Sequence, residues 1–254
     1  MNVFVTGASS GIGAALAQHY AARGFNLGLF ARNADRLEAL QATLPAKRCA
    51  IYVGDVRDAS ALMEAAAAFR TRFGLPHIVI ANAGVSVGTL TEHEVDNASF
   101  MTVLDTNVLG MLYTFQPFVP AMRQARRGTL VGIASVAGFR GVPGSGAYSA
   151  SKAAAIAYLE SLRVEMRDSG VSVVTICPGF IDTPLTQGNP YGMPFLLSPE
   201  SAARRIAKAI EQRRRFYVVP WQMALFGRVL RVLPRPIYDR LFARAPRKLR
   251  EIER

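Results

Sequence analysis

Hydrophobic residues along this chain gather in short continuous runs, separated by longer stretches in which they recur at helical spacing. Continuous apolar runs bounded by turn residues are typical of strands buried on both faces of a parallel sheet. Seven runs are predicted as strands, at residues 3–6, 26–30, 49–53, 77–81, 129–134, 171–177 and 216–219. Helices are predicted between them, at residues 13–23, 34–43, 59–73, 98–123, 147–168 and 199–213.

The alternation predicts an α/β fold, in which right-handed crossovers build a doubly wound parallel seven-stranded sheet of Rossmann-like topology. No linker, repeat or low-complexity tract interrupts residues 1–220, so these residues are predicted to form one domain. Residues 221–254 are predicted to form a basic, amphipathic helical extension.

A glycine-rich turn, Thr6-Gly-Ala-Ser-Ser-Gly-Ile-Gly13, follows the first strand and leads directly into a helix. Gly7 allows the tight turn, Gly11 lets backbone approach a pyrophosphate, and Gly13 lets the helix pack closely on the strand. The positive end of the helix then faces the anion. Because the turn joins a strand to a helix, it predicts a dinucleotide-binding site.

The second strand ends in Ala31-Arg32-Asn33, with no acidic side chain to bind a ribose 2′-hydroxyl. Arg32 can instead pair with a 2′-phosphate, which favours NADP over NAD. The alternative is a solvated arginine beside a helix that Asn33 caps.

Small and polar residues also follow the third and fourth strands, as Gly54-Asp55-Val56 and Asn82-Ala83-Gly84. Sheets of this type bind ligands at the carboxyl ends of their strands, so both segments suit a cofactor that lies across them. Asp55 can accept a hydrogen bond from an adenine amino group. A simple turn is the alternative for each segment.

Tyr148 and Lys152 stand four residues apart at the start of a predicted helix, so their side chains leave the same helix face. An ammonium beside a phenol stabilises the phenolate and lowers its pKa from about 10. A tyrosine that exchanges protons near neutral pH needs such a shift. Taken alone, the pair would be better explained as two surface side chains that share a helix face, because such pairs are common.

Two more polar residues are candidates for the same site. Ser135 follows the fifth strand and therefore lies at the carboxyl edge of the predicted sheet. Asn107 lies within an otherwise apolar predicted helix, although asparagine is a poor helix former. Either a structural bend or a water-holding role would explain Asn107.

In combination, these motifs resemble those of the short-chain dehydrogenases/reductases in their single-domain form, over residues 1 to about 220. The resemblance rests on the glycine-rich turn, Asp55, Asn82-Ala-Gly84, Asn107, Ser135, Tyr148-Ser-Ala-Ser-Lys152, and Pro178-Gly179 with Thr183. It implies hydride transfer between NADP(H) and a carbonyl or alcohol substrate. The cofactor carries the hydride, and the protein supplies orientation and electrostatics.

The resemblance also implies a role for each site residue. Tyr148 is expected to act as the acid in carbonyl reduction and as the base in alcohol oxidation. Lys152 is expected to lower the Tyr148 pKa and to bond the nicotinamide ribose, Ser135 to hold the substrate oxygen, and Asn107 to hold a water. The expected cofactor-binding residues are Gly7, Ser9, Ser10, Gly11, Ile12, Gly13, Arg32, Asp55, Val56, Asn82, Ala83, Gly84, Tyr148, Lys152, Pro178, Gly179, Ile181 and Thr183. No metal site is expected.

The substrate pocket is expected to use residues 136–145, the residues after Gly84, and residues 182–199. The last segment is rich in apolar side chains and contains the breakers Gly188, Pro190, Gly192 and Pro194. It is predicted either to be a mobile lid over an apolar or lipid-like substrate, or to bury its side chains against the body whatever the ligand. Arg140 is expected to face solvent rather than an anionic group of the substrate.

The formal net charge of +12 is concentrated in the tail, because residues 213–254 contain twelve Lys and Arg but three acidic residues. Such a segment suits an anionic membrane surface. The favoured alternative packs its apolar side on the body or on a second subunit. No nucleic-acid-binding motif accompanies the charge, so no nucleic-acid partner is expected.

Cys49 and Cys177 are expected to be buried thiols, because both lie in apolar runs. Neither a spanning segment nor a signal peptide is expected, since the first residues already have the pattern of a strand. A cytoplasmic homo-oligomer, dimer or tetramer, is therefore expected, with possible contact to a membrane surface. Two other functions stay open: a dinucleotide-binding sensor or scaffold without turnover, and a membrane-surface protein that acts through its tail.

Overall fold

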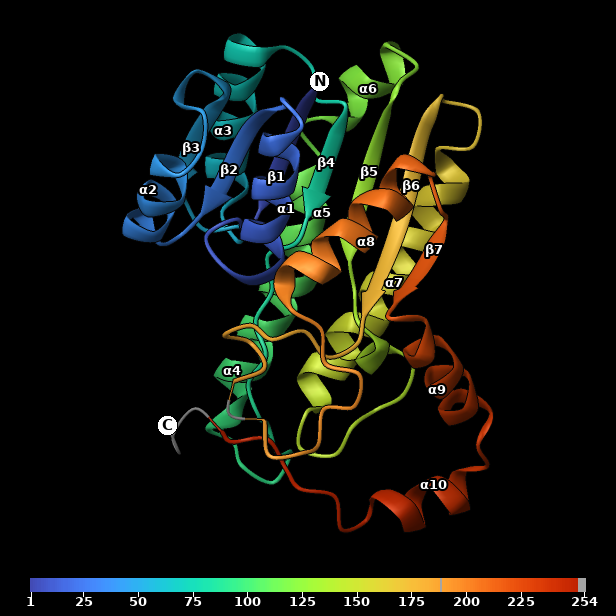
Figure 1. Ribbon diagram of the computed structural model, residues 1–254. Coiled ribbons are helices and arrows are strands. Elements are labelled where there is room, and N and C mark those ends of the chain that lie inside the picture. Colours follow the sequence, from blue (N-terminus) through green and yellow to red (C-terminus); the bar gives the residue numbers. More distant parts are fainter. Residues whose placement is uncertain (188, 251–254) are drawn as a thin grey trace.

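A computed structural model describes residues 1–187 and 189–250 (Figure 1). Seven parallel strands form one sheet in the order β3-β2-β1-β4-β5-β6-β7. The strands are β1 (Asn2–Thr6), β2 (Asn26–Ala31), β3 (Cys49–Val53), β4 (Ile78–Ala81), β5 (Gly128–Ile133), β6 (Val171–Pro178) and β7 (Phe216–Val219). The predicted doubly wound, seven-stranded sheet is confirmed, and each predicted strand is present.

Helices cover both faces of the sheet (Figure 1). One face carries α1 (Gly11–Ala22), α2 (Ala34–Ala42) and α8 (Pro199–Glu211). The other carries α3 (Ala59–Phe73), α5 (Gly110–Phe115) and α7 (Gly146–Glu165). The remaining helices are α4 (Asp96–Leu104), α6 (Val119–Gln124), α9 (Trp221–Val232) and α10 (Arg235–Phe242), with short helical turns at Ala46–Arg48, Asp105–Leu109 and Val136–Gly138.

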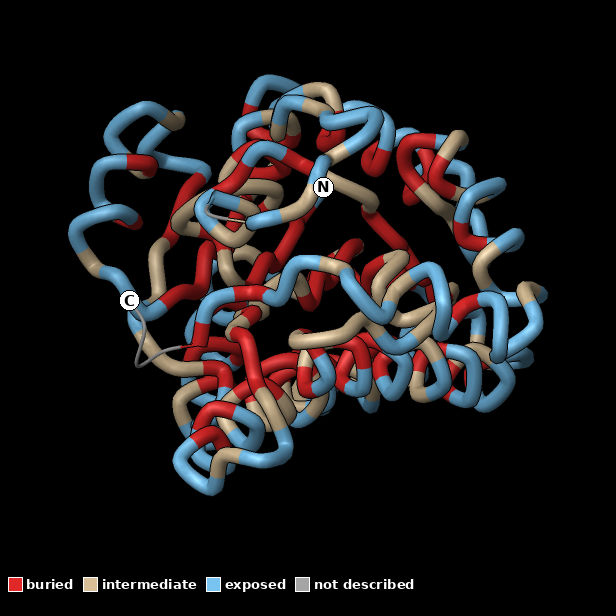
Figure 2. Tube along the Cα trace, turned by 90° about the horizontal axis from the view of Figure 1, so that it is seen from below, coloured by how far each residue is buried: buried red, intermediate tan, exposed pale blue. Residues whose placement is uncertain are grey.

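The sheet separates two hydrophobic cores. Successive strand residues point to opposite faces, so Val3 and Val5 enter one core while Phe4 enters the other. The Phe4 ring lies 5.5 Å from that of Phe69 and 5.0 Å from that of Phe118, between ring centroids. Figure 2 shows the buried strands enclosed by helices whose outer sides are exposed. Both layers thus hold the strand ends rigidly in place.

The single helix predicted at residues 98–123 is wrong. The chain forms α4, a π-helical turn at Asp105–Leu109, α5 and α6 in succession. Asn107 lies in the π-helical turn, and its side-chain amide is hydrogen-bonded to Val85 and Ser151 in other segments. Pro120 lies in the first turn of α6. Both residues disfavour an uninterrupted helix, and π-helical turns frequently mark functional sites.

Two short helices, α9 and α10, follow the sheet and lie at its carboxyl edge (Figure 1). Met223 and Gly227 of α9 are buried against Gly179 and Phe139. The solvent-facing position expected for Arg140 is wrong, because its guanidinium donates to the carbonyl oxygens of Leu230 (2.6 Å) and Leu233 (2.7 Å). Part of the extension is therefore packed on the body of the protein.

Both cysteines are buried and free, as expected. Among the helices that the structure describes, none is long and apolar enough to cross a membrane. In the same described ranges, no group of three or more His, Cys, Asp or Glu side chains could hold a metal ion.

Candidate active site

A cavity of about 670 Å³ lies at the carboxyl edge of the sheet, among the segments that follow the strands. Of the predicted site residues, Asn107 and Gly13 lie outside its wall, and the rest line it: Gly7, Ser9, Ser10, Gly11, Ile12, Arg32, Asp55, Val56, Asn82, Ala83, Gly84, Ser135, Tyr148, Lys152, Pro178, Gly179, Ile181 and Thr183. Ends of strands that are distant in sequence thus meet in one site, as the sheet topology predicts.

At its glycine positions, the glycine-rich turn leaves little space for a side chain. Gly7 and Gly11 have φ angles of 63° and 53°, and a Cβ on Gly13 would lie 2.2 Å from the carbonyl oxygen of Gly7. The Asn82 amide braces this turn by donating to the carbonyl oxygens of Thr6 and Gly7, both at 3.1 Å. Asn82 thus lines the cavity mainly as a structural support.

The N-terminus of α1 opens toward the cavity. Its N-cap residue, Ser10, makes no side-chain hydrogen bond to the first turn, although serine is a common capping residue. The first backbone N–H groups of a helix have no intrahelical acceptor and lie at the positive end of its dipole. Together with the tight glycines, this geometry fits a diphosphate group.

The end of β2 supplies positive charge to one end of the cavity. The exposed Arg32 side chain has its Nη1 atom 3.7 Å from Oδ2 of Asp55, and Arg36 lines the same wall. Asn33 accepts from the backbone N–H of Arg36 at 2.8 Å, which is the predicted helix cap. Asn33 therefore caps α2 while the neighbouring Arg32 lines the cavity, so the two predicted alternatives occur together.

The Asp55 carboxylate is already paired. Arg57 donates to it from Nη2 (2.7 Å), Nε (3.0 Å) and its backbone N–H (2.9 Å). Burial alone would raise the pKa of Asp55, but the hydrogen bonds from Arg57 outweigh it and hold this pKa below its ordinary value. Asp55 is therefore an ionised acceptor in the cavity wall beside Arg32.

Ser135, Tyr148 and Lys152 meet at the other end. Ser135 follows β5, Tyr148 lies in the first turn of α7, and both residues line the cavity. The Ser135 hydroxyl accepts from the backbone N–H of Ala137 at 3.1 Å. Lys152 is 4 % exposed, and its Nζ atom lies 5.7 Å from the centre of the Tyr148 ring. The same Nζ atom donates to the carbonyl oxygen of Ile133 at 2.9 Å. A proton donor, a second hydroxyl and a cation therefore share one wall.

In this structure, burial outweighs the expected lowering of the Tyr148 pKa by Lys152. Burial raises the pKa of Tyr148 to about 12, and the nearby Ser135 hydroxyl offsets only part of that rise. Burial also lowers the pKa of Lys152 to about 8. Desolvation penalises the charged form of both groups, and Lys152 directs its ammonium at Ile133 rather than at the phenol.

Asn107 is 1 % exposed and lies behind the cavity wall. Its Oδ1 atom accepts from the N–H of Val85 (2.8 Å), and its Nδ2 atom donates to the carbonyl oxygen of Val85 (3.0 Å) and to Oγ of Ser151 (2.9 Å). The side chain thus joins the loop after β4 to α7. The structural alternative explains why an asparagine occurs here.

The segment after β6 follows neither predicted alternative fully. Its ends are held together, because Asp182 N–H donates to Leu197 O (2.9 Å) and Leu197 N–H donates to Phe180 O (3.1 Å). Leu185 is partly buried and lines the cavity, whereas Phe195 is exposed. Gly188, one of the expected breakers, lies outside the described residues.

Other residues of the cavity wall were not singled out as site residues in the sequence: Ala31, Asn33, Arg36, Gly54, Val85, Thr106, Ile133, Ala134, Pro184, Leu185 and Thr186. Most of them adjoin a predicted site residue at a strand end, so extending each motif by a residue would have found them. Thr106 belongs to the π-helical turn, where it directly precedes the predicted site residue Asn107.

Comparison with known proteins agrees with the fold and the motifs. The family model for short chain dehydrogenases matches residues 1–192. An uncharacterized oxidoreductase of Myxococcus xanthus is 39% identical over 237 residues, which are 92% of this chain and 93% of the relative. A sulfoacetaldehyde reductase of Chromohalobacter salexigens is 35% identical over 186 residues, covering 72% of this chain and 74% of that protein.

Solved structures agree as well. An alcohol dehydrogenase of the archaeon Thermococcus sibiricus, in complex with 5-hydroxy-NADP, superposes with a TM-score of 0.76 at 28% identity and covers 86% of this chain and 94% of that chain. A short-chain dehydrogenase of Streptomyces avermitilis gives a TM-score of 0.80 at 26% identity, covering 95% and 94% of the two chains. This chain, with its glycine-rich turn and its Ser135, Tyr148 and Lys152 in one cavity, therefore belongs to the short-chain dehydrogenase/reductase family and is an oxidoreductase of that family.

Proposed function

We propose that this protein is an NADP(H)-dependent oxidoreductase that interconverts a carbonyl and an alcohol. The observation that carries the proposal is that Ser135, Tyr148 and the buried Lys152 line the same cavity as the glycine-rich turn. A protein that only sensed a dinucleotide would have no use for a proton donor at the far end of the cavity.

The residues present fit a bound dinucleotide. Gly7 and Gly11 line the cavity beside the open N-terminus of α1, whose first N–H groups suit a diphosphate. When bound, the nicotinamide supplies or accepts the hydride. The protein's part is to hold the substrate oxygen and to move a proton.

Tyr148 is protonated at neutral pH, because burial raises its pKa to about 12. In carbonyl reduction it donates this proton from its hydroxyl to the substrate oxygen, while Ser135 holds the same oxygen by a hydrogen bond. A charged Lys152 stabilises the phenolate that is left. Asn107 supports the site indirectly, because it fixes Val85 against α7.

The choice of NADP over NAD rests on the end of β2. Arg32 and Arg36 line the cavity there, and the nearby carboxylate of Asp55 is bound by Arg57. Arginine binds phosphate oxygens with charge-assisted hydrogen bonds, so these side chains favour a 2′-phosphate. The structural relative from Thermococcus sibiricus holds an NADP derivative, which supports the same choice.

The cofactor preference is tested by titrating the protein with NADPH and NADH and comparing the dissociation constants. Arg32→Asp should weaken NADPH binding about tenfold or more while changing NADH binding little, since it removes one charge-assisted contact. Arg70→Asp, at the far end of α3, is the matched control and should leave both constants unchanged. An unaltered preference in Arg32→Asp would show that Arg32 does not bind the phosphate.

We further propose that the substrate is apolar, because Leu185 and Pro184 of the segment after β6 line the cavity. We also propose that the extension contacts an anionic membrane surface. Trp221, Leu225, Val229 and Val232 are exposed on α9 at spacings of three and four residues, and Arg228 lies beside them. Basic helices with such a stripe lie in the interface of anionic bilayers. We also propose a homo-oligomer, as is common in the family.

Sedimentation with vesicles tests the membrane contact. The protein should sediment with vesicles that contain phosphatidylglycerol but not with pure phosphatidylcholine, and Leu225→Glu should reduce that binding severalfold. Met63→Glu introduces the same charge at an exposed apolar residue of α3 and should change nothing. Equal sedimentation of the wild type with both kinds of vesicle, or none, contradicts the proposal.

A further inference from the structure

The last described residues return from α10 to the substrate side of the cavity. In Figure 1 the red segment that follows α10 passes beneath the sheet toward α4. Arg250 pairs with Gly88 in a parallel bridge, and the Gly88 N–H donates to the carbonyl oxygen of Leu249 at 3.0 Å. The C-terminal segment, residues 247–250, is thus bound to the loop that follows β4.

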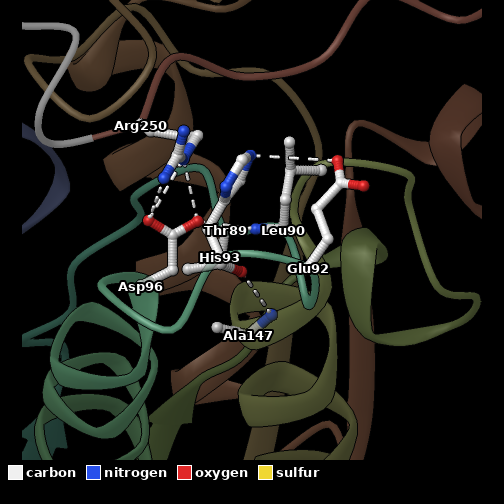
Figure 3. A network of polar contacts seen from close by, with 7 residues as sticks. All are labelled: Thr89, Leu90, Glu92, His93, Asp96, Ala147 and Arg250. Atoms are coloured by element: carbon white, nitrogen blue, oxygen red, sulfur yellow. Dashed lines mark hydrogen bonds and ion pairs between the residues drawn. The ribbon is translucent and has the colours of Figure 1, made fainter.

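A buried ion pair fixes the end of this segment (Figure 3). The Arg250 guanidinium donates to the Asp96 carboxylate from Nε (2.9 and 3.1 Å) and Nη2 (3.0 Å), and the two side chains are 9% and 8% exposed. Asp96 also accepts from the N–H of Leu90 at 2.8 Å. Such a bidentate pair is geometrically specific, and losing either partner would leave the other charge buried.

Lys248 connects two loops that border the cavity. It is buried, and its Nζ atom donates to Oγ of Ser86 (2.9 Å) and to the carbonyl oxygen of Leu185 (3.4 Å). Leu185 lines the cavity, and Ser86 directly follows Val85, which also lines it. A single ammonium therefore links the loop after β4 to the segment after β6.

Two glycines make room for the C-terminal segment. A Cβ on Gly88 would lie 2.1 Å from the carbonyl oxygen of Lys248, and one on Gly144 would lie 2.8 Å from the Cβ of Arg247. Gly144 belongs to the loop after β5, and its carbonyl oxygen accepts from the N–H of Thr89 at 3.2 Å. The segment therefore contacts the loops after β4, β5 and β6, which surround the expected substrate end.

We propose that residues 247–250 act as a latch that holds these loops in place and so shapes the substrate site. Asp96, Lys248 and Arg250 are then positioning residues, which act through Val85 and Leu185 rather than by touching the reacting atoms. The effect on catalysis rests on the proposed function, whereas the effect on the loops does not.

Hydrogen exchange of the full-length protein tests the latch directly. Arg250→Gln should increase amide exchange at least threefold in peptides covering residues 84–95 and 182–187, with no change in strands β1 and β2. Arg250→Lys keeps one charged donor and should lie between the wild type and Arg250→Gln. Arg244→Gln, an exposed arginine of the same extension, is the matched control and should behave as the wild type.

Lys248→Met is a second test of the latch, and it leaves the ion pair between Arg250 and Asp96 intact. It should increase amide exchange in residues 182–187. Thermal unfolding serves as the control that the variant is folded. Unchanged exchange at 182–187 in both Lys248→Met and Arg250→Gln would overturn the latch. Faster exchange in every peptide, strands included, would also overturn it, because the tail would then be only a general stabiliser.

Steady-state kinetics distinguish this proposal from the function itself. With NADPH and a chain-length series of aldehydes, Arg250→Gln should raise KM for the aldehyde about fivefold, while kcat and the NADPH dissociation constant stay near the wild-type values. A wild type that oxidises no NADPH would refute the proposed function and leave the exchange result standing. An equal fall in kcat and in NADPH affinity would refute the positioning role.

Discussion

The Lys152 ammonium is almost completely buried. It donates a hydrogen bond to the Ile133 carbonyl oxygen and lies 5.7 Å from the centre of the Tyr148 ring. Helical spacing places the two residues on one face of α7, but it does not determine where the end of a long side chain points. Burial then moves the pKa of Lys152 down and that of Tyr148 up. The residue types and their spacing could be predicted from the sequence, whereas the direction of the tyrosine shift depends on desolvation by the whole fold.

These shifts lead to a pH dependence with a defined sign. As the pH rises through about 8, Lys152 loses its charge, while Tyr148 keeps its proton up to about 12. Because the charged lysine stabilises the phenolate formed in reduction, kcat/KM for carbonyl reduction should fall through about pH 8. Lys152→Arg, whose charge persists beyond pH 12, should show no such fall. A wild-type profile that is flat up to about pH 10 would contradict the assignment.

At the scale of elements, the π-helical turn shows what a local pattern cannot reveal. The apolar spacing of residues 98–123 predicts one helix, although Asn107 and Pro120 are poor residues for a helix interior. Its partner, Val85, is 22 residues away, so the sequence could not identify the hydrogen bonds that hold the turn. The strands, by contrast, could be predicted because each is a continuous apolar run between turn residues.

Asn107→Ala tests this element. The change leaves the half-buried N–H and C=O of Val85 without the Asn107 amide and removes its bond to the buried Ser151 hydroxyl. Because an unsatisfied group costs about 1–3 kcal/mol when fully buried, we expect a loss of about 1–3 kcal/mol in the free energy of unfolding. Urea denaturation measures it. Asn97→Ala, on an exposed position of α4, should change stability by less than about 0.5 kcal/mol. Equal midpoints for the two variants would mean that the Asn107 bonds contribute nothing.

For the whole molecule, the topology explains why so much of the cavity could be predicted. In a doubly wound sheet the carboxyl ends of the strands converge, so motifs after β1, β2, β4 and β5 had to meet. The course of residues 221–250 could not be predicted, because contacts such as that between Asp96 and Arg250 join residues 154 positions apart. Nothing in the local composition of a basic tail indicates such a partner.

The most direct test of the central claim is NADPH oxidation by the wild type and by Tyr148→Phe, measured with a panel of ketones and aldehydes of increasing chain length. The account predicts that the wild type binds NADPH more tightly than NADH and oxidises it with at least one carbonyl compound. Tyr148→Phe should bind NADPH equally well, yet turn over at least about a hundredfold more slowly, because it lacks the proton donor. A wild type that binds neither cofactor, or a Tyr148→Phe variant as active as the wild type, would contradict the account.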